Sequence, residues 1–253
     1  MSSTKLRDRV ALVTGASSGI GRAVALRLAS LGCRVVITAR RGERLEALAR
    51  EIRAEHPKAL VSALPCDLRY ADAIESLFDR IRREWGGVDI MINNAGLGRH
   101  APLCSGATEK WREMLEVNVL ALCVCTREAI TDMKARGDRG HVVHIASMAS
   151  HRVPSGSGVY SATKYAVRSL TEGLRLELRE AHSKIRVSAI SPGFVETEFA
   201  EIYHGRPEAA QEAYGRFEVL QPEDVADAVA YVISAPEHVQ VHDILIRPTQ
   251  QPS

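Results

Sequence analysis

The chain has 253 residues, of which 45% are hydrophobic and 25% charged, and its formal net charge is +2. This length fits one large α/β domain or two small ones, and the balanced charge gives no reason to expect a nucleic-acid or anionic-membrane partner. The amino terminus lacks the apolar segment of a secretory signal, and no apolar run approaches the roughly 20 residues of a membrane helix. We therefore expect a cytoplasmic protein with no membrane partner.

Short apolar runs alternate with longer amphipathic stretches along the chain. Several of the short runs are nearly continuous Val, Ile and Leu, which is typical of strands buried on both faces. The predicted strands are Val10–Thr14, Arg34–Thr38, Leu60–Leu64, Val88–Ile92, His141–Ala146, Ile185–Ser191 and Asp243–Ile246. The predicted helices are Gly19–Leu31, Glu43–Glu55, Ala71–Glu84, Thr108–Ala135, Tyr160–Ala181 and Pro222–Ser234. This rhythm predicts an α/β three-layer sandwich, with about seven parallel strands and helices on both faces.

With no low-complexity linker, we expect a single domain over residues 1–253. Its nucleotide-binding half should span about residues 1–150 and its catalytic and substrate half about 140–253. The segment Glu196–Leu220 departs from the rhythm and carries four aromatic residues, Phe199, Tyr203, Tyr214 and Phe217. Because it follows a strand end, we expect it to cover a cleft beyond the carboxyl edge of the sheet. A surface excursion with incidental aromatics is the alternative.

The first predicted strand runs directly into a glycine-rich turn, Thr14-Gly-Ala-Ser-Ser-Gly-Ile-Gly21. Its glycines permit a tight turn and close approach of the backbone to an anion at the helix amino terminus. The spacing differs from the common dinucleotide fingerprint, and no Lys-Ser/Thr pair follows as a P-loop requires. The position of the turn, at the first strand–helix junction, indicates a nucleotide site.

The end of the second predicted strand bears on the choice of dinucleotide. An NAD site would place Asp or Glu there to accept from the ribose 2′-hydroxyl, whereas this chain has Ala39 followed by Arg40 and Arg41. Guanidinium groups bind a 2′-phosphate that a carboxylate would repel. These residues predict NADP(H) over NAD(H), with two solvated arginines opening a helix as the alternative.

Tyr160 and Lys164 are four residues apart on one predicted helix, so they share a face. An ammonium beside a phenol favours the phenolate, so the pKa of Tyr160 should fall from its free value of about 10 towards neutrality. Such a phenol can exchange a proton with a carbonyl oxygen near pH 7. On its own, the motif is more often an exposed Tyr and an exposed Lys one turn apart, which describes most Tyr-x-x-x-Lys pairs.

Two further motifs contain amide side chains. Asn118 shares an apolar helical stripe with Trp111, Leu115 and Leu122, where an unpaired amide would cost about 1–3 kcal/mol. We therefore expect a hydrogen-bond partner for Asn118, and a purely structural one fits the spacing as well as a functional one. Asn93-Asn-Ala-Gly96 follows the fourth predicted strand, where small residues suit a backbone that passes close to a bound cofactor.

These motifs occur in one order over essentially the whole chain: the glycine turn, Asn93–Gly96, Asn118, Ser147, Tyr160-x-x-x-Lys164 and Pro192-Gly193. Together they resemble a classical short-chain dehydrogenase/reductase, which implies a Rossmann-type fold. Three stretches, Asn118-Val-Leu-Ala-Leu, Ser-Met-Ala-Ser-His-Arg-Val and Asp243-Ile-Leu-Ile-Arg-Pro-Thr249, are similar to an animal dehydrogenase/reductase subgroup that reduces ketosteroids and other ketones. Related bacterial reductases share parts of these stretches.

The resemblance implies a role for each matching residue. Tyr160 would be the general acid in reduction and the base in oxidation. Lys164 would lower its pKa and hydrogen-bond the nicotinamide ribose. Ser147 would donate to the substrate oxygen, and Asn118 would hold a water linking Lys164 to solvent. The implied substrate-facing residues are Ser147, Tyr160, Phe199 and Tyr203.

The resemblance also implies a set of cofactor-binding residues around the pyrophosphate, adenine, ribose and carboxamide. They are Gly15, Ser17, Ser18, Gly19, Ile20, Arg40, Arg41, Asp67, Leu68, Asn94, Ala95, Gly96, Tyr160, Lys164, Pro192, Gly193, Val195 and Thr197. Many NADP-preferring members carry a basic residue just before the second glycine of the turn, where this chain has Ser18. The NADP(H) prediction therefore depends on Arg40 and Arg41.

The predicted reaction is hydride transfer between NADP(H) and an apolar ketone or secondary alcohol, with ketosteroids as candidates. No metal is required, and the five cysteines show no zinc-ligand spacing. One alternative is a dehydrogenase of small hydroxy acids or sugars, with Arg99, His100, His151 and Arg152 as a cationic clamp. A non-catalytic NADP-binding regulator is disfavoured because all four catalytic side chains are retained. The resemblance further implies a homodimer or homotetramer that pairs the helices over Thr108–Ala135 and Tyr160–Ala181.

Overall fold

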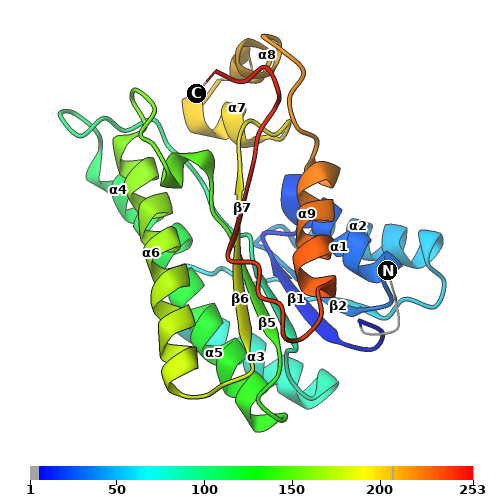
Figure 1. The fold of residues 1–253 in the computed structure, drawn as a ribbon. Coiled ribbons are helices and arrows are strands. Elements are labelled where there is room, and N and C mark those ends of the chain that lie inside the picture. Colours follow the sequence, from blue (N-terminus) through cyan, green and yellow to red (C-terminus); the bar gives the residue numbers. More distant parts are fainter. Residues whose placement is uncertain (1–5, 207, 253) are drawn as a thin grey trace.

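The computed structural model describes residues 6–206 and 208–252, and within them seven parallel strands form one sheet (Figure 1). The strands are β1 (Val10–Thr14), β2 (Arg34–Thr38), β3 (Val61–Ala63), β4 (Ile90–Asn93), β5 (His141–Ile145), β6 (Arg186–Pro192) and β7 (Asp243–Ile246). Their order is β3-β2-β1-β4-β5-β6-β7. The direction of winding reverses between β1 and β4, and ligands of such sheets bind beyond the carboxyl ends of the strands at this point.

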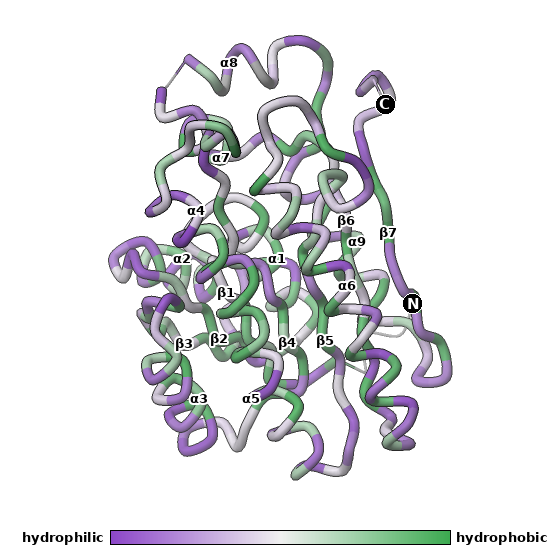
Figure 2. The backbone as a smooth tube through the Cα atoms, turned by 90° about the vertical axis from the view of Figure 1, so that its left-hand side faces the viewer, coloured by the Kyte–Doolittle hydropathy of each residue, from purple (hydrophilic) through white to green (hydrophobic). Residues whose placement is uncertain are grey.

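Helices cover both faces of the sheet, as the strand pattern predicted (Figure 1). One face carries α1 (Gly19–Ser30), α2 (Gly42–Glu55) and α9 (Pro222–Ser234), and the other carries α3 (Ala71–Trp85), α5 (Ala121–Ala135) and α6 (Gly158–Glu180). Figure 2 shows hydrophobic residues concentrated on the central strands and hydrophilic ones along the outer helices. In the described part of the chain, no helix is both long and apolar enough to cross a bilayer.

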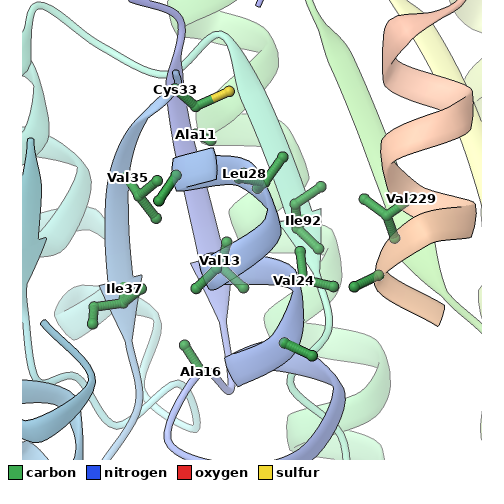
Figure 3. Close-up of a cluster of buried hydrophobic side chains, with 14 of the residues drawn as sticks. Ala11, Val13, Ala16, Val24, Leu28, Cys33, Val35, Ile37, Ile92 and Val229 are labelled. Atoms are coloured by element: carbon green, nitrogen blue, oxygen red, sulfur yellow. The ribbon is translucent and has the colours of Figure 1, made fainter. Parts of the chain in front are cut away.

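Alternate residues of β1 enter two separate cores. Ala11 and Val13 pack with Leu28 of α1 and Val229 of α9 (Figure 3), whereas Leu12 packs on the opposite face. A strand directs successive side chains to opposite faces, so a strand buried on both faces is apolar throughout. This explains why β1 reads as an unbroken apolar run.

One predicted helix is wrong as a single element. The stretch Thr108–Ala135 consists of α4 (Thr108–Leu115), a π-helical turn (Glu116–Leu120) and α5. A π turn inserts an extra residue and so shifts the helical face that follows it. Leu115 precedes the π turn and Asn118 lies within it, so the α-helical spacing that predicted one shared stripe does not hold: Leu115 is 50% exposed, whereas Asn118 is buried.

The segment after β6 forms two short helices beyond the carboxyl edge of the sheet, α7 (Phe199–His204) and α8 (Glu208–Tyr214) (Figure 1). Val195 and Leu220 close the base of this excursion through a parallel β-bridge. We refer to residues 196–206 as the strap. The other short element at this edge is a 3₁₀ turn, Met148–Ser150, which follows β5.

A directed chain of hydrogen bonds ties α5 and α6 to the sheet through His144 on β5. The Thr171 hydroxyl donates to Val167 O at 2.8 Å, so it accepts from His144 Nδ1 at 2.8 Å. His144 Nε2 then accepts from Thr126 Oγ1 at 3.3 Å, and Thr126 accepts from the Asn93 amide at 2.9 Å. Burial keeps His144 neutral, and because its Nδ1–H donates to Thr171, its Nε2 is left as an acceptor in this network.

We expect acid to destabilise the fold through His144. Burial, with a smaller effect from the charge of Lys164, lowers the pKa of His144 to about 3 from its ordinary 6.5. Between these values the unfolded chain binds a proton that the folded chain does not, so the free energy of unfolding should fall with decreasing pH by up to about 1.4 kcal/mol per pH unit.

Urea unfolding at two pH values in this window measures the effect. His144→Gln should reduce the pH slope by about one proton, whereas His238→Gln, at an exposed position, should not change it. An unchanged slope in His144→Gln would contradict this interpretation.

Candidate active site

The glycine turn joins β1 to α1 at the point where the sheet reverses its winding. Gly15 and Gly19 have positive φ angles of 66° and 52°. A Cβ on Gly15 would lie 2.9 Å from the Cα of Ala95, so the turn packs against the residues after β4 backbone to backbone. Ser18, the N-cap of α1, forms no side-chain capping bond within the described structure, which leaves the first N–H groups of α1 for another acceptor.

Asn94 and Thr14 hold this packing together. Asn94 Nδ2 donates to Thr14 O at 2.8 Å and to Gly15 O at 3.3 Å. The Thr14 hydroxyl accepts from the backbone N–H groups of Asn94 and Ala95, both at 3.0 Å. The predicted residues of the glycine turn and of Asn94–Gly96 therefore form one continuous surface.

Ser147, Tyr160 and Lys164 meet between the end of β5 and the start of α6. Lys164 is buried, and its Nζ donates to Ile145 O at 2.9 Å and lies 6.0 Å from the ring centre of Tyr160. The Ser147 hydroxyl is near enough to Tyr160 to lower the pKa of that phenol. It also accepts from Ala149 N at 3.0 Å, which fixes its position at the start of the 3₁₀ turn.

The pKa of Tyr160 departs from the prediction. Burial raises it to about 12, which outweighs the lowering effect of the nearby Ser147 hydroxyl. Burial also lowers the pKa of Lys164 to about 8. The prediction that Lys164 draws the phenol towards neutrality is therefore wrong for the protein without ligands, because desolvation dominates and the ammonium bonds a backbone carbonyl instead.

Asn118 lies in the π turn and faces the same cluster. Its Oδ1 accepts from Leu97 N at 2.8 Å, and its Nδ2 donates to Leu97 O at 2.8 Å and to Thr163 Oγ1 at 3.0 Å. Both amide hydrogens thus have acceptors, and one lone pair of Oδ1 is left for a water. Gly96 lies between Asn118 and Lys164, because a Cβ on it would be 3.4 Å from Asn118 Oδ1 and 3.5 Å from Lys164 Nζ.

Arg41 lies over the glycine turn. Its guanidinium donates to Ser17 Oγ at 2.9 and 3.1 Å and to Ser18 Oγ at 2.8 Å. Arg40 precedes it and is exposed. On the next strand, Asp67 and Leu68 follow β3 at the same edge. Asp67 accepts from the guanidinium of Arg69, and hydrogen bonding to Arg69 lowers the pKa of Asp67 despite partial burial.

Sequence reasoning missed two residues at this edge. Glu198 of the strap accepts from Arg41 at 3.0 Å and from Arg44 at 2.5 Å. The spacing of Arg41 and Arg44, three residues apart at the start of α2, could have indicated a paired cationic site. Nothing in the sequence pattern indicated a carboxylate from the strap.

The strap crosses from the glycine turn to Tyr160. At one end, a Cβ on Gly19 would lie 2.9 Å from Thr197 Cγ2. At the other end, the ring centres of Phe199 and Tyr203 lie 5.3 and 6.2 Å from that of Tyr160. The strap therefore contacts both predicted ends of the site. Of the other predicted residues, Pro192 ends β6, and Gly193 follows it and donates its N–H to Ile246 O at 2.7 Å.

Three of the four residues of the alternative cationic clamp are engaged within the protein, and the fourth, His100, is exposed. Arg99 pairs with Glu113 at 3.0 Å, and His151 pairs with Asp243 at 3.1 Å. Arg152 donates to Pro252 O at 3.3 Å. The structure thus leaves these groups poorly placed to hold a substrate carboxylate. Over residues 6–206 and 208–252, no group of three or more His, Cys, Asp or Glu residues is arranged to bind a metal.

Known proteins resemble the chain along nearly its whole length. A family model described as short chain dehydrogenase matches residues 9–205. Dehydrogenase/reductase SDR family member 11 from Bos taurus is 54% identical over 97% of this chain and 98% of its own length. Farnesol dehydrogenase from Aedes aegypti is 42% identical over 95% of this chain and 96% of its own.

The fold has close counterparts among solved structures. The closed form of serine dehydrogenase complexed with NADP+ superposes with a TM-score of 0.90, at 33% sequence identity and with 96% of each chain covered. Sequence, motif order and architecture thus agree. The chain belongs to the short-chain dehydrogenase/reductase family of oxidoreductases, in its animal-type dehydrogenase/reductase subgroup.

Proposed function

We propose that the protein is an NADP(H)-dependent carbonyl reductase, acting reversibly as an alcohol dehydrogenase, on apolar ketones or secondary alcohols. The observation that carries this proposal is the meeting of Ser147, Tyr160 and Lys164 beside the glycine turn. A hydrogen-bond donor, a proton donor and a buried cation lie together at the edge where a dinucleotide would bind.

The residues at the sheet edge fit a dinucleotide. Gly15 and Gly19 of the glycine turn have positive φ angles, and the turn has no room for a Cβ at Gly15. The first N–H groups of α1, at the end of this turn, have no side-chain capping partner in the described structure, which suits a pyrophosphate. Arg40 and Arg41 follow β2 where an NAD site would have a carboxylate, and we propose that they hold a 2′-phosphate. The serine dehydrogenase neighbour, which was solved with NADP+, supports this choice.

In the proposed mechanism, a bound nicotinamide supplies the hydride. Ser147 Oγ and Tyr160 Oη donate hydrogen bonds to the carbonyl oxygen and stabilise the negative charge that develops there. Because burial raises the pKa of Tyr160 to about 12, the phenol retains its proton until the substrate oxygen takes it. The ammonium of Lys164, held by Ile145 O, then stabilises the phenolate that remains.

The strap supports an apolar substrate. Phe199 and Tyr203 present aromatic rings to Tyr160, and we propose that the strap serves as the lid over the substrate. The relative named farnesol dehydrogenase also supports an apolar alcohol or the carbonyl compound formed from it, and ketosteroids are apolar carbonyl compounds as well. Small hydroxy acids and sugars fit less well, because the basic residues near the strap already pair within the protein.

We also propose a homodimer or homotetramer built on α4, the π turn and α6. Leu115, Leu120 and Leu176 lie on these elements and are each about half exposed, at 50%, 54% and 47%. Apolar side chains of this size clustered on neighbouring helices are typical of a surface covered by another subunit.

NADPH should be preferred over NADH in kcat/KM. Arg40→Ala and Arg41→Ala should each lower the NADPH value about 10- to 100-fold, because a hydrogen bond to a charged group contributes about 1.5–3 kcal/mol. The NADH value should change little, and steady-state rates with one apolar ketone give both numbers. An equal or higher kcat/KM for NADH in the wild-type enzyme would contradict the proposed cofactor.

Tyr160→Phe should lower kcat at least about 100-fold while leaving the NADPH dissociation constant nearly unchanged, because it removes only the proton donor. Tyr165→Phe is a matched control, since Tyr165 lies on the same helix and is exposed. Retained turnover in Tyr160→Phe would remove Tyr160 from the role of acid.

A further inference from the structure

Glu198 of the strap is held by two guanidinium groups of α2 and the turn before it. Its Oε2 lies 3.0 Å from Arg41 Nη1, and its Oε1 lies 2.5 Å from Arg44 Nη1. Although partial burial raises it, the pKa of Glu198 is lowered overall by hydrogen bonds to Arg44 and Arg41. Glu198 is therefore an anion of the protein itself that pairs with the arginines beside the glycine turn.

Arg41 uses different edges of its guanidinium for different partners. Nε and Nη2 bind the hydroxyls of Ser17 and Ser18, and Nη1 binds Glu198. The hydroxyls keep the guanidinium over the turn, and the carboxylate occupies the remaining edge. Carboxylate and phosphate oxygens bind guanidinium in the same way, so an incoming phosphate must compete with Glu198 for this edge.

We propose that Glu198 is a specificity-determining residue, an internal anion that occupies Arg41 in the free protein and that the 2′-phosphate of NADP(H) displaces. The inference rests on the proposed function, in which Arg41 holds that phosphate. NADH has a 2′-hydroxyl in place of the phosphate and so carries no charge at the 2′ position that could displace the carboxylate from Arg41.

Displacement of Glu198 would affect the surroundings of Tyr160 through the strap. Glu198 directly precedes Phe199, whose ring lies 5.3 Å from that of Tyr160. Thr197, on its other side, lies against Gly19. As long as Glu198 is paired with Arg41 and Arg44, the strap is fastened across the glycine turn with Phe199 over the phenol. Exchange of the carboxylate for the 2′-phosphate on Arg41 removes one of these two pairs and so loosens this part of the strap.

Glu198→Gln tests the competition. Removing the internal anion should lower the dissociation constant of NADPH about three- to tenfold, as expected for the loss of a competing, partly exposed ion pair, and should leave that of NADH within about twofold. Both constants are measured by calorimetric titration at one ionic strength.

Glu196→Gln is the matched control for charge. It removes the same charge two residues earlier, where the carboxylate accepts from the Gln221 side chain instead of an arginine. A nonspecific electrostatic gain would appear in both variants, whereas the proposed competition appears in Glu198→Gln alone. An equal gain in Glu196→Gln would therefore overturn the inference.

Amide hydrogen exchange tests the release of the strap. In the wild-type protein, saturating adenosine 2′,5′-bisphosphate should speed exchange over Phe199–His204, and adenosine 5′-monophosphate should not. In Glu198→Gln the same amides should exchange fast without either nucleotide. Equal exchange with the two nucleotides in the wild-type protein would overturn the inference.

Failure of the inference and of the proposed function are distinguishable. If NADPH binds more tightly than NADH but Glu198→Gln does not improve NADPH binding, the inference is overturned and the proposed cofactor stands. If the wild-type protein binds NADPH no better than NADH, the proposed cofactor is overturned, and the inference with it.

Discussion

At the carboxyl edge of the sheet Lys164 is buried and Tyr160 is partly buried against the strap, and the cost of desolvation decides what each can do. Burial opposes charge on both groups, so it raises the pKa of the phenol to about 12 and lowers that of the ammonium to about 8. The phenol is thereby kept protonated. A group in this state is suited to donate a proton to a carbonyl oxygen, and a neighbouring cation matters most after the proton has left.

The cluster around Tyr160 and Lys164 is assembled from parts of the chain that are far apart. Ser147 is the N-cap of the 3₁₀ turn after β5. Asn118 lies in the π turn, and its amide donates hydrogen bonds to Leu97 and Thr163. The strap supplies the aromatic cover, and its ion pair with Arg41 and Arg44 anchors that cover at the nucleotide end. The proposed proton donor, the proposed cofactor site and the proposed substrate lid are therefore linked by direct contacts at one edge of the sheet.

The order of strands and helices could be predicted because local patterns encode it. Unbroken apolar runs such as β1 occur when both faces of a strand are buried, and glycines with positive φ must sit where the turn requires them. The motifs also identified the residues that meet at the sheet edge, because carboxyl ends of parallel strands converge there.

Other features of the structure could not be predicted from such sequence patterns. The π turn depends on a hydrogen-bond register that apolar spacing does not report, so Leu115 was misplaced. The pKa of Tyr160 depends on a cover that comes from the strap, and spacing to Lys164 alone suggested the opposite direction. Glu198 and Arg44 are 154 residues apart in the chain, and only the folded structure brings them together.

Ultraviolet difference titration of the wild-type protein against Tyr160→Phe, without cofactor, tests the central role of desolvation most directly. The difference isolates the ionisation of this phenol from that of the other tyrosines. Desolvation predicts no phenolate signal from Tyr160 below about pH 10, the ordinary pKa of tyrosine, and a midpoint near 12. A midpoint near neutrality would show instead that Lys164 controls the phenol in the free protein, and would contradict this account.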